Sequence, residues 1–213
     1  MKRKIIGIGY KMGSGKDALA DCLVAEHGYV KYRFADAVKD VATAMFGCAY
    51  STMNSQDGKN SIEPITGRVL REVLQIIGES ARTGFGSDVW IRILLAKIDE
   101  SSDQNIVISD LRYRNEFEVL KGRGIVCRID RPREKRGLGP PGSAVELHAS
   151  ETQLDGVPDE QWHAVVNNSG NREYLSDYAG HLDMFYGALR AGTMSQMRLD
   201  DSGMQCCSNE NAV

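Results

Sequence analysis

The chain has 213 residues, of which 42% are hydrophobic and 26% are charged, enough apolar material for one globular domain with a sizeable core. Its formal net charge of −3 argues against a broad nucleic-acid-binding surface, because such surfaces are usually strongly basic. The five cysteines are odd in number and lack C-x-x-C spacing, which indicates neither a disulfide framework nor a zinc site and favours the cytoplasm. No apolar stretch approaches the roughly 18 residues of a membrane span, so we expect no membrane and no nucleic acid as partner.

Short apolar runs alternate with longer amphipathic stretches along most of the chain. Strands are predicted at 4–9, 29–34, 105–110, 124–130 and 163–168. Helices are predicted at 16–27, 35–46, 66–82, 87–98, 115–121 and 173–190, an exposed loop at 47–65, and a disordered polar tail at 193–213. This alternation predicts an α/β fold with a mostly parallel five-stranded sheet and helices on both faces. Ligands of such sheets bind beyond the carboxyl ends of the strands.

The first predicted strand runs into the stretch GYKMGSGKDA, which nearly matches the phosphate-binding pattern G-x-x-x-x-G-K-[ST]. Glycines at 13 and 15 allow backbone N–H groups to converge on phosphate oxygens, and Lys16 would reach the β- and γ-phosphates. The alternative is a glycine-rich turn that binds nothing. Its place between a strand and a helix favours the phosphate site.

Two acids are candidates to replace the hydroxyl that the pattern expects at position 17. Asp17 could bind Mg²⁺ directly or through water, or could simply favour the first turn of the helix; Ser14 is the nearest remaining hydroxyl. Asp110 ends a predicted strand, where an acid often orients metal-bound water, although it could instead cap the next helix. Arg112 could then bind a phosphate as a bidentate fork.

Two further regions carry polar groups of uncertain role. One side of the helix at 66–82 presents two cations, Arg71 and Arg82. Between them lie the amide of Gln75 and a gap at Gly78. These could hold a monophosphate and a base edge, or form a solvated face. A glycine- and proline-containing stretch at 131–147 could be a basic flap over transferring phosphates or a solvated loop, and HASE at 148–151 could be catalytic or begin a helix.

Several of these stretches together resemble the phage-type deoxynucleoside monophosphate kinases, from about residue 5 to residue 155. The resemblance is carried by GSGKD, FADAVK, REVLQIIGE, DVWI, IVISDLRYRNE, RIDRP and HASE, in the order of that family. It departs from the family at Tyr10, where glycine is common, and at Ala18, where threonine is frequent.

The resemblance implies a three-layer P-loop kinase domain at 1–192, with a monophosphate-binding helical region at about 35–100 and the flap at about 131–147. It implies transfer of the γ-phosphoryl group of ATP to a deoxynucleoside monophosphate. For the metal we favour Mg²⁺ held through water by Asp17 and Asp110, with Ser14 as the competing ligand. Carried over by position, the ATP-binding residues are Gly13, Ser14, Gly15, Lys16 and Asp17, and the substrate-binding residues are Lys11, Arg71, Gln75, Asp110 and Arg112. The residues expected to stabilise the transferring group are Lys16, Arg131, Arg133 and Arg136.

Two other classes of function remain open on the sequence. One is another small-molecule P-loop kinase, such as one acting on a coenzyme precursor, and the other is a nucleotide-sensing module without transferase activity. The sequence leaves open the accepted bases, the choice between ribose and deoxyribose, and whether the protein is a homodimer. For a phage-encoded enzyme the expected location is the host cytoplasm.

Overall fold

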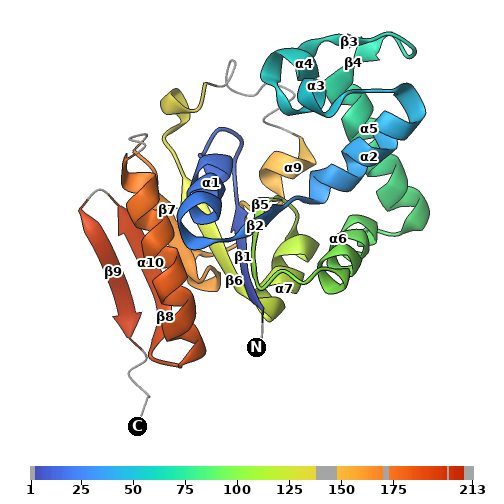
Figure 1. Cartoon of the computed structure of the whole chain (residues 1–213). Helices are drawn as coiled ribbons and strands as arrows, with labels where there is room; N and C mark the ends of the chain where they lie inside the picture. Colours follow the sequence, from blue (N-terminus) through green and yellow to red (C-terminus); the bar gives the residue numbers. More distant parts are fainter. Residues whose placement is uncertain (1–2, 138–147, 170–172, 201, 209–213) are drawn as a thin grey trace. The chain divides into compact units, whose positions relative to one another are not determined.

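A computed structural model of the protein describes residues 3–137, 148–169, 173–200 and 202–208 (Figure 1). The chain divides into two compact units. The first consists of residues 1–32 and 103–213, and the second is Arg33–Ser102.

The first unit is built on a seven-stranded sheet in the order β2-β5-β1-β6-β7-β8-β9. The strands are β1 (Lys4–Gly9), β2 (Val30–Tyr32), β5 (Asn105–Leu111), β6 (Ile125–Asp130), β7 (Ala164–Asn167), β8 (Met194–Asp200) and β9 (Gly203–Ser208). Every neighbouring pair is parallel except β8 and β9. The five predicted strands are all present, and the predicted α/β class with a mostly parallel sheet is confirmed.

The last two strands are a correction to the sequence prediction, which placed a disordered tail at 193–213 and counted five strands. Strand β8 pairs with β7, and β9 folds back on β8 as a hairpin. Met197 and Leu199 are buried on either side of the exposed Arg198, a period of two that is too short to stand out in a polar segment. The backbone pairing with β7 stabilises β8 although its apolar pattern is weak.

Helices cover both faces of this sheet, as Figure 1 shows for α1 (Lys16–His27) and α10 (Glu173–Arg190) on one face and α7 (Arg114–Arg123) on the other. The alternation of side chains along β1 explains the arrangement. Ile6 and Ile8 lie in the core cluster formed with α1 and α10. Gly7 points the other way, where a Cβ atom would lie 2.7 Å from Leu120 Cδ1, so its lack of a side chain lets α7 approach the sheet closely.

The second unit consists of five helices and a two-stranded sheet among the residues described. They are α2 (Phe34–Phe46), α3 (Tyr50–Asn54), α4 (Gln56–Asn60), β3 (Ile62–Glu63), β4 (Arg68–Val69), α5 (Leu70–Phe85) and α6 (Val89–Glu100). Its small core is formed by Ala42, Met53, Leu70 and Val73. The predicted loop at 47–65 thus holds two short helices.

Helix α5 begins four residues later than the sequence predicts, because residues 62–69 form a turn between β3 and β4. The carboxylate of Glu63 stabilises that turn by accepting hydrogen bonds from the backbone N–H groups of Ile65, at 2.9 Å, and Thr66, at 2.7 Å. These bonds compete with the start of a helix at residue 66.

Three short helical turns complete the described chain: η1 (Arg133–Lys135), α9 (Ala149–Thr152) and η2 (Asp159–Gln161). Most of the predicted flap, residues 138–147, lies outside the described residues. Among the helices that the structure does describe, none has the length and apolar character needed to cross a membrane.

Candidate active site

The site lies at the carboxyl ends of β1, β5 and β6, which are neighbours in the sheet. The parallel register brings Gly9 of β1 opposite both Leu111 of β5 and Arg128 of β6. The segments that follow these three strands therefore leave the sheet at one edge. They contain the predicted phosphate loop, Arg112, and the start of the predicted flap.

Two glycines of the phosphate loop have positive φ and no room for a side chain. Gly13 has a φ of 73°, and a Cβ there would lie 2.5 Å from the carbonyl oxygen of Arg136. Gly15 has a φ of 107°, and a Cβ there would lie 2.4 Å from Asn168 Nδ2. The same amide donates a hydrogen bond of 2.8 Å to the carbonyl of Ser14, so the loop is clamped from β7's end.

Asn168 was missed by sequence reasoning. Its place as the last residue of the final predicted strand, 163–168, at the ligand-binding edge of the sheet, is the signal that could have found it.

Tyr10 occupies the position where the resembled family commonly has glycine, and its backbone explains why glycine suits that place. Its φ is 102°, the only positive φ of a non-glycine residue in the described chain. Gly9 is the last residue of β1, so Tyr10 is the first residue of the loop. Such a backbone costs about 1–3 kcal/mol and persists only where the surroundings hold it.

The ring of Tyr10 is held by a line of charged groups. The guanidinium of Arg128 lies 4.6 Å from the ring centroid. Arg128 in turn pairs with Asp130 and Asp159, each at 2.5 Å, and Asp159 also accepts from Arg198 of β8 at 3.1 Å. Burial raises the pKa of the Tyr10 hydroxyl, against the opposing effect of Arg128.

Lys16 is buried, with 5% of its surface exposed, and its ammonium group is turned back onto the loop. The Nζ atom donates to the carbonyl of Tyr10 at 3.1 Å, to the carbonyl of Lys11, and to Ser14 Oγ at 3.4 Å. Burial lowers its pKa well below the ordinary value, and the nearby Arg112 adds to this. Three carboxylates act in the opposite direction: Glu151, Asp17 and Asp110.

Asp17 reaches β5 through a serine that sequence reasoning missed. Ser109 Oγ donates a hydrogen bond of 3.0 Å to Asp17 Oδ1, while Lys31 Nζ lies 3.7 Å from the same oxygen. Ser109 directly precedes Asp110, and that adjacency is the signal that could have identified it. The hydroxyl near Asp17 therefore comes from β5, whereas Ser14 is buried beside Lys16.

The donors gathered at this place suit a hard cation. Carboxylate and hydroxyl oxygens are the ligands that Mg²⁺ prefers, and Mg²⁺ usually takes only one or two carboxylates beside phosphate and water. No group of three or more His, Cys, Asp or Glu side chains able to hold a metal occurs in the described ranges. These donors are compatible with a cation that is also bound by phosphate and water, and the magnesium site at Asp17 and Asp110 stays a prediction.

The alternative role of Asp110 as a helix cap was wrong. Helix α7 has Tyr113 at its N-cap, and the buried carboxylate of Glu116 satisfies the preceding backbone. It accepts hydrogen bonds from the N–H groups of Arg112, at 2.9 Å, and Tyr113, at 3.0 Å. Asp110 is therefore not needed for the start of the helix.

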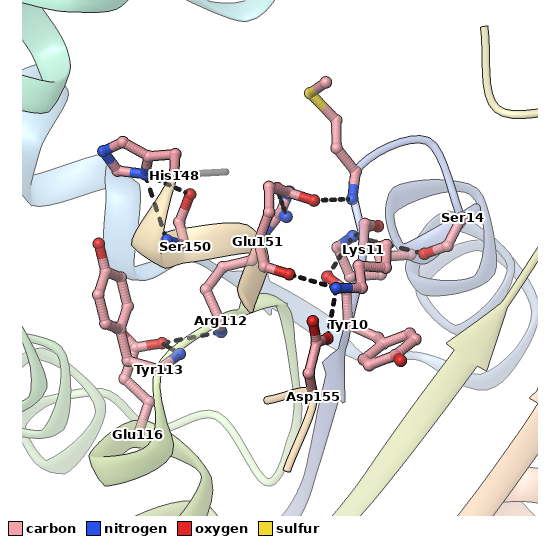
Figure 2. A network of polar contacts seen from close by, with 12 residues as sticks. Tyr10, Lys11, Ser14, Arg112, Tyr113, Glu116, His148, Ser150, Glu151 and Asp155 are labelled. Atoms are coloured by element: carbon pink, nitrogen blue, oxygen red, sulfur yellow. Dashed lines mark hydrogen bonds and ion pairs between the residues drawn. The ribbon is translucent and has the colours of Figure 1, made fainter. Parts of the chain in front are cut away.

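Arg112 and Lys11, two predicted substrate-binding residues, meet at the segment around α9 (Figure 2). Arg112 Nη1 pairs with Glu151 Oε1, and Glu151 Oε2 accepts a hydrogen bond of 2.6 Å from the backbone N–H of Met12. Lys11 Nζ donates to the carbonyl of Glu151 at 2.5 Å and pairs with Asp155. Glu151 lies at the centre of this network.

The HASE stretch begins a helix, which is one of the two roles left open by the sequence. His148 is the N-cap of α9, and its Nδ1 accepts a hydrogen bond of 3.2 Å from the N–H of Ser150. Ser150 Oγ lies 2.9 Å from the same nitrogen.

The three predicted flap arginines lie at the beginning of the segment 131–147. They are Arg131, Arg133 and Arg136. Arg131 lines an open pocket of about 680 Å³. The other lining residues are Arg128, Asp130, Pro132, Asn167, Asn168, Ser169, Asp200 and Ser202. The Nε atoms of Arg131 and Arg136 are buried without a hydrogen-bond partner in the described part of the chain. Arg133 lies in η1, whose Lys135 donates a hydrogen bond of 2.8 Å to the carbonyl of Ser169.

Arg71 and Gln75 lie on α5 in the second unit. Arg71 Nη2 donates to Gln56 Oε1 at 2.9 Å and to Asn60 Oδ1 at 3.3 Å, and Arg82 pairs with Glu79. Gly78 is buried, and its carbonyl accepts a hydrogen bond of 3.0 Å from Trp90 Nε1. The tryptophan of α6 thus binds the backbone of Gly78, whereas a Cβ atom at Gly78 would lie 3.5 Å from Arg82 Nη1, so the gap adjoins the side chain of Arg82.

The chain was compared with known proteins, and none of the family models matches it. It is 32% identical over 149 residues to the uncharacterized protein ORF77 of Ictalurid herpesvirus 1 (strain Auburn), which covers 68% of this chain. The match spans only 56% of the length of that viral protein. It is 25% identical over 199 residues to a protein of Acanthamoeba polyphaga mimivirus named "Putative deoxynucleotide monophosphate kinase", covering 84% of this chain and 96% of that protein.

Among solved structures, TT1252 from Thermus thermophilus is similar to 86% of this chain, with a TM-score of 0.50 and 18% identity over 98% of its own length. The shikimate kinase of Aquifex aeolicus has a TM-score of 0.48 and 15% identity, covering 87% of this chain and 98% of its own. At these identities the likeness concerns the fold alone.

Proposed function

We propose that the protein is a deoxynucleoside monophosphate kinase, which transfers the γ-phosphoryl group of ATP to a dNMP and releases a dNDP and ADP. The observation that carries this proposal is the buried Lys16 ammonium, which lies inside a glycine-bearing loop and close to the charge of Arg112. The similarity to the mimivirus protein over 96% of its length supports the choice of acceptor.

The donor side of the proposal rests on the loop and the pocket beside it. In the proposed complex, the N–H groups of residues 13–17 bind the phosphates of ATP, and Lys16 leaves the loop carbonyls for the β- and γ-phosphates. Asn168 joins the pocket to the loop, because it lines the one and donates to Ser14 of the other. A volume of about 680 Å³ is enough for the nucleoside part of the donor.

The acceptor side of the proposal is assigned to Lys11, Arg112 and Asp110 at the loop. Arg71 and Gln75, on α5 of the second unit, are proposed as acceptor-binding residues from the family resemblance alone. Arginine binds a monophosphate as a bidentate fork, and a glutamine amide can pair with a base edge. Arg71 already donates two hydrogen bonds to neutral side-chain oxygens. Exchanging such partners for a phosphate dianion is favourable because charge-assisted hydrogen bonds are stronger.

Transfer to a monophosphate needs no general base, because the attacking phosphate oxygen is already ionised near neutral pH. Catalysis then consists of positioning and of charge stabilisation. Lys16 and the flap arginines Arg131, Arg133 and Arg136 would offset the charge that spreads over the transferring group. Asp17 and Asp110 would hold Mg²⁺ through water, and the ion would supply positive charge that neutralises the phosphates.

A coupled ADP-release assay over a panel of acceptors tests the proposal. The panel contains each ribonucleoside and deoxynucleoside monophosphate, shikimate and phosphorylatable coenzyme precursors, and ATP binding is measured separately by calorimetry. We expect turnover with at least one deoxynucleoside monophosphate. Turnover confined to the other small molecules would replace this function with a different kinase, and ATP binding without any turnover would indicate a nucleotide sensor.

A further inference from the structure

Glu151 belongs to the network around the phosphate loop. Its carboxylate is largely buried, and no role has yet been given to it. Only 8% of its side chain is exposed, yet it comes from α9, 139 residues after the loop residue that it contacts. Removing a carboxylate from water is costly unless cations or hydrogen-bond donors compensate for it. Here the compensation comes from two groups of the site itself.

Each carboxylate oxygen of Glu151 has a different partner. Oε1 pairs with the guanidinium of Arg112, and Oε2 accepts the backbone N–H of Met12 at 2.6 Å. Figure 2 shows Glu151 lying between Arg112 and the loop. One side chain therefore fixes the arginine on β5's end and the entrance of the phosphate loop with respect to each other.

The backbones on both sides of this contact are also anchored. The N–H of Arg112 is bound by Glu116 at 2.9 Å, so the arginine is held at its main chain and at its guanidinium. The carbonyl of Glu151 accepts from Lys11 Nζ at 2.5 Å, which ties α9 to the loop a second time. Held in this way, the cationic fork loses little freedom when a phosphate arrives, and such preorganisation favours transfer.

We propose that Glu151 is a positioning residue, which holds the guanidinium of Arg112 and the N–H of Met12 in the arrangement that receives the phosphoryl groups. It acts through these two partners and does not touch the reacting atoms. The inference rests on the proposed function only for the identity of the acceptor, since it concerns the loop and Arg112 for any phosphoryl transfer from ATP.

A double-mutant cycle on phosphoryl transfer tests the proposal, using whichever acceptor the wild type accepts, water included. We expect Glu151→Ala to lower kcat by about 100-fold and Arg112→Ala by at least as much. Because Glu151→Gln keeps an acceptor for Met12 and loses only the charge that pairs with Arg112, the Glu151→Gln/Arg112→Ala double variant should be within about 3-fold of Arg112→Ala alone. Glu151→Gln, which keeps an acceptor for Met12 but loses the charge, should lie between wild type and Glu151→Ala.

The matched control is Glu118→Gln, which removes the charge from an exposed glutamate–arginine pair on α7, at 2.8 Å from Arg114. It should leave kcat within about 2-fold of wild type, because it lies outside the network. The melting temperature is recorded for every variant. If Glu151→Ala does not fold, the cycle remains complete, because it uses Glu151→Gln, whose shape is the same.

Two results would overturn the role of Glu151. Multiplicative losses in the double variant would mean that it does not act through Arg112. A Glu151 variant that binds ATP more tightly and turns over as fast as wild type would mean that its carboxylate only occupies the place of a phosphate. Wild-type turnover restricted to acceptors other than monophosphates overturns the proposed function instead, and leaves the cycle readable.

Discussion

The phosphate loop and the polar face of α5 were predicted from the same kind of sequence signal, but they are held in opposite ways. The loop is anchored from far along the chain: Asn168 binds Ser14 across 154 positions, and Glu151 binds Met12 across 139. On α5, Arg71 binds partners 15 and 11 positions away, and Arg82 binds Glu79, three positions away.

This difference teaches what each region tolerates. A loop fixed by distant segments has one geometry, because two positive-φ glycines, one buried contact and one partly buried contact determine it together. A face whose arginines bind neighbouring, exposed side chains can exchange those partners for a ligand at small cost. Substitutions in the loop should therefore abolish function or folding, and substitutions on α5 should change affinity.

The largest effect is expected for Lys16→Ala. The variant should lose kcat by roughly a thousandfold or more, because in the proposed complex Lys16 supplies positive charge to the transferring group. Its melting temperature should stay near that of wild type. The hydrogen bonds of the ammonium group are lost, but the variant no longer has to bury a charge. Lys97→Ala, an exposed position on α6, is the control, and near-normal turnover of Lys16→Ala would contradict the assignment.

The next effect tests the clamp on the loop. Gly15→Ala should lower the free energy of unfolding by about 2–4 kcal/mol, because it combines a strained φ with a clash against Asn168 Nδ2. Gly28→Ala has a similar φ problem at 66° but open space around it, so it should cost only about 1 kcal/mol. Equal losses for the two variants, measured by urea unfolding, would show that the Asn168 contact does not matter.

A smaller effect is expected on α5. Arg71→Ala should raise KM for the monophosphate by about 10- to 100-fold and leave KM for ATP nearly unchanged, because the variant cannot make the proposed bidentate phosphate contact. Steady-state kinetics with each substrate varied separately measures both. A change confined to ATP would remove Arg71 from the acceptor side.

The smallest effect concerns the pH dependence of stability. It involves His163, the residue that directly precedes β7. His163 Nδ1 accepts a hydrogen bond of 3.0 Å from the N–H of Val126, and burial, aided by Lys121, lowers its pKa to about 4. Since the folded pKa is below the unfolded value of about 6.5, the stabilisation is complete above pH 6.5 and is lost as pH falls toward 4.

With allowance for its partial exposure, His163 should make the protein about 1 kcal/mol less stable at pH 5 than at pH 7. Urea unfolding of wild type and His163→Asn at both values checks this prediction. The variant should lose that part of the pH dependence, and an unchanged slope would assign the dependence to other groups.

The sequence predicts well those features that depend on residues close together in the chain. Strong apolar runs and a helix such as Glu173–Arg190 appear where their periodicity indicates, and the loop is recognised from its own glycines and lysine. Asn168, Ser109 and Glu151 act on the loop through contacts that no local pattern encodes. The β8–β9 hairpin escaped prediction for the same reason, because its stability comes from the edge of β7.

A line of charged side chains connects the C-terminal hairpin to the first loop of the chain. Arg198 pairs with Asp159, Asp159 with Arg128, and Arg128 lies over the ring that accompanies the strained backbone of Tyr10. A premature stop codon after residue 192 would delete Arg198 and expose the edge of β7. We expect such a truncated gene product to lose affinity for nucleotide although all of its phosphate-binding residues are still encoded.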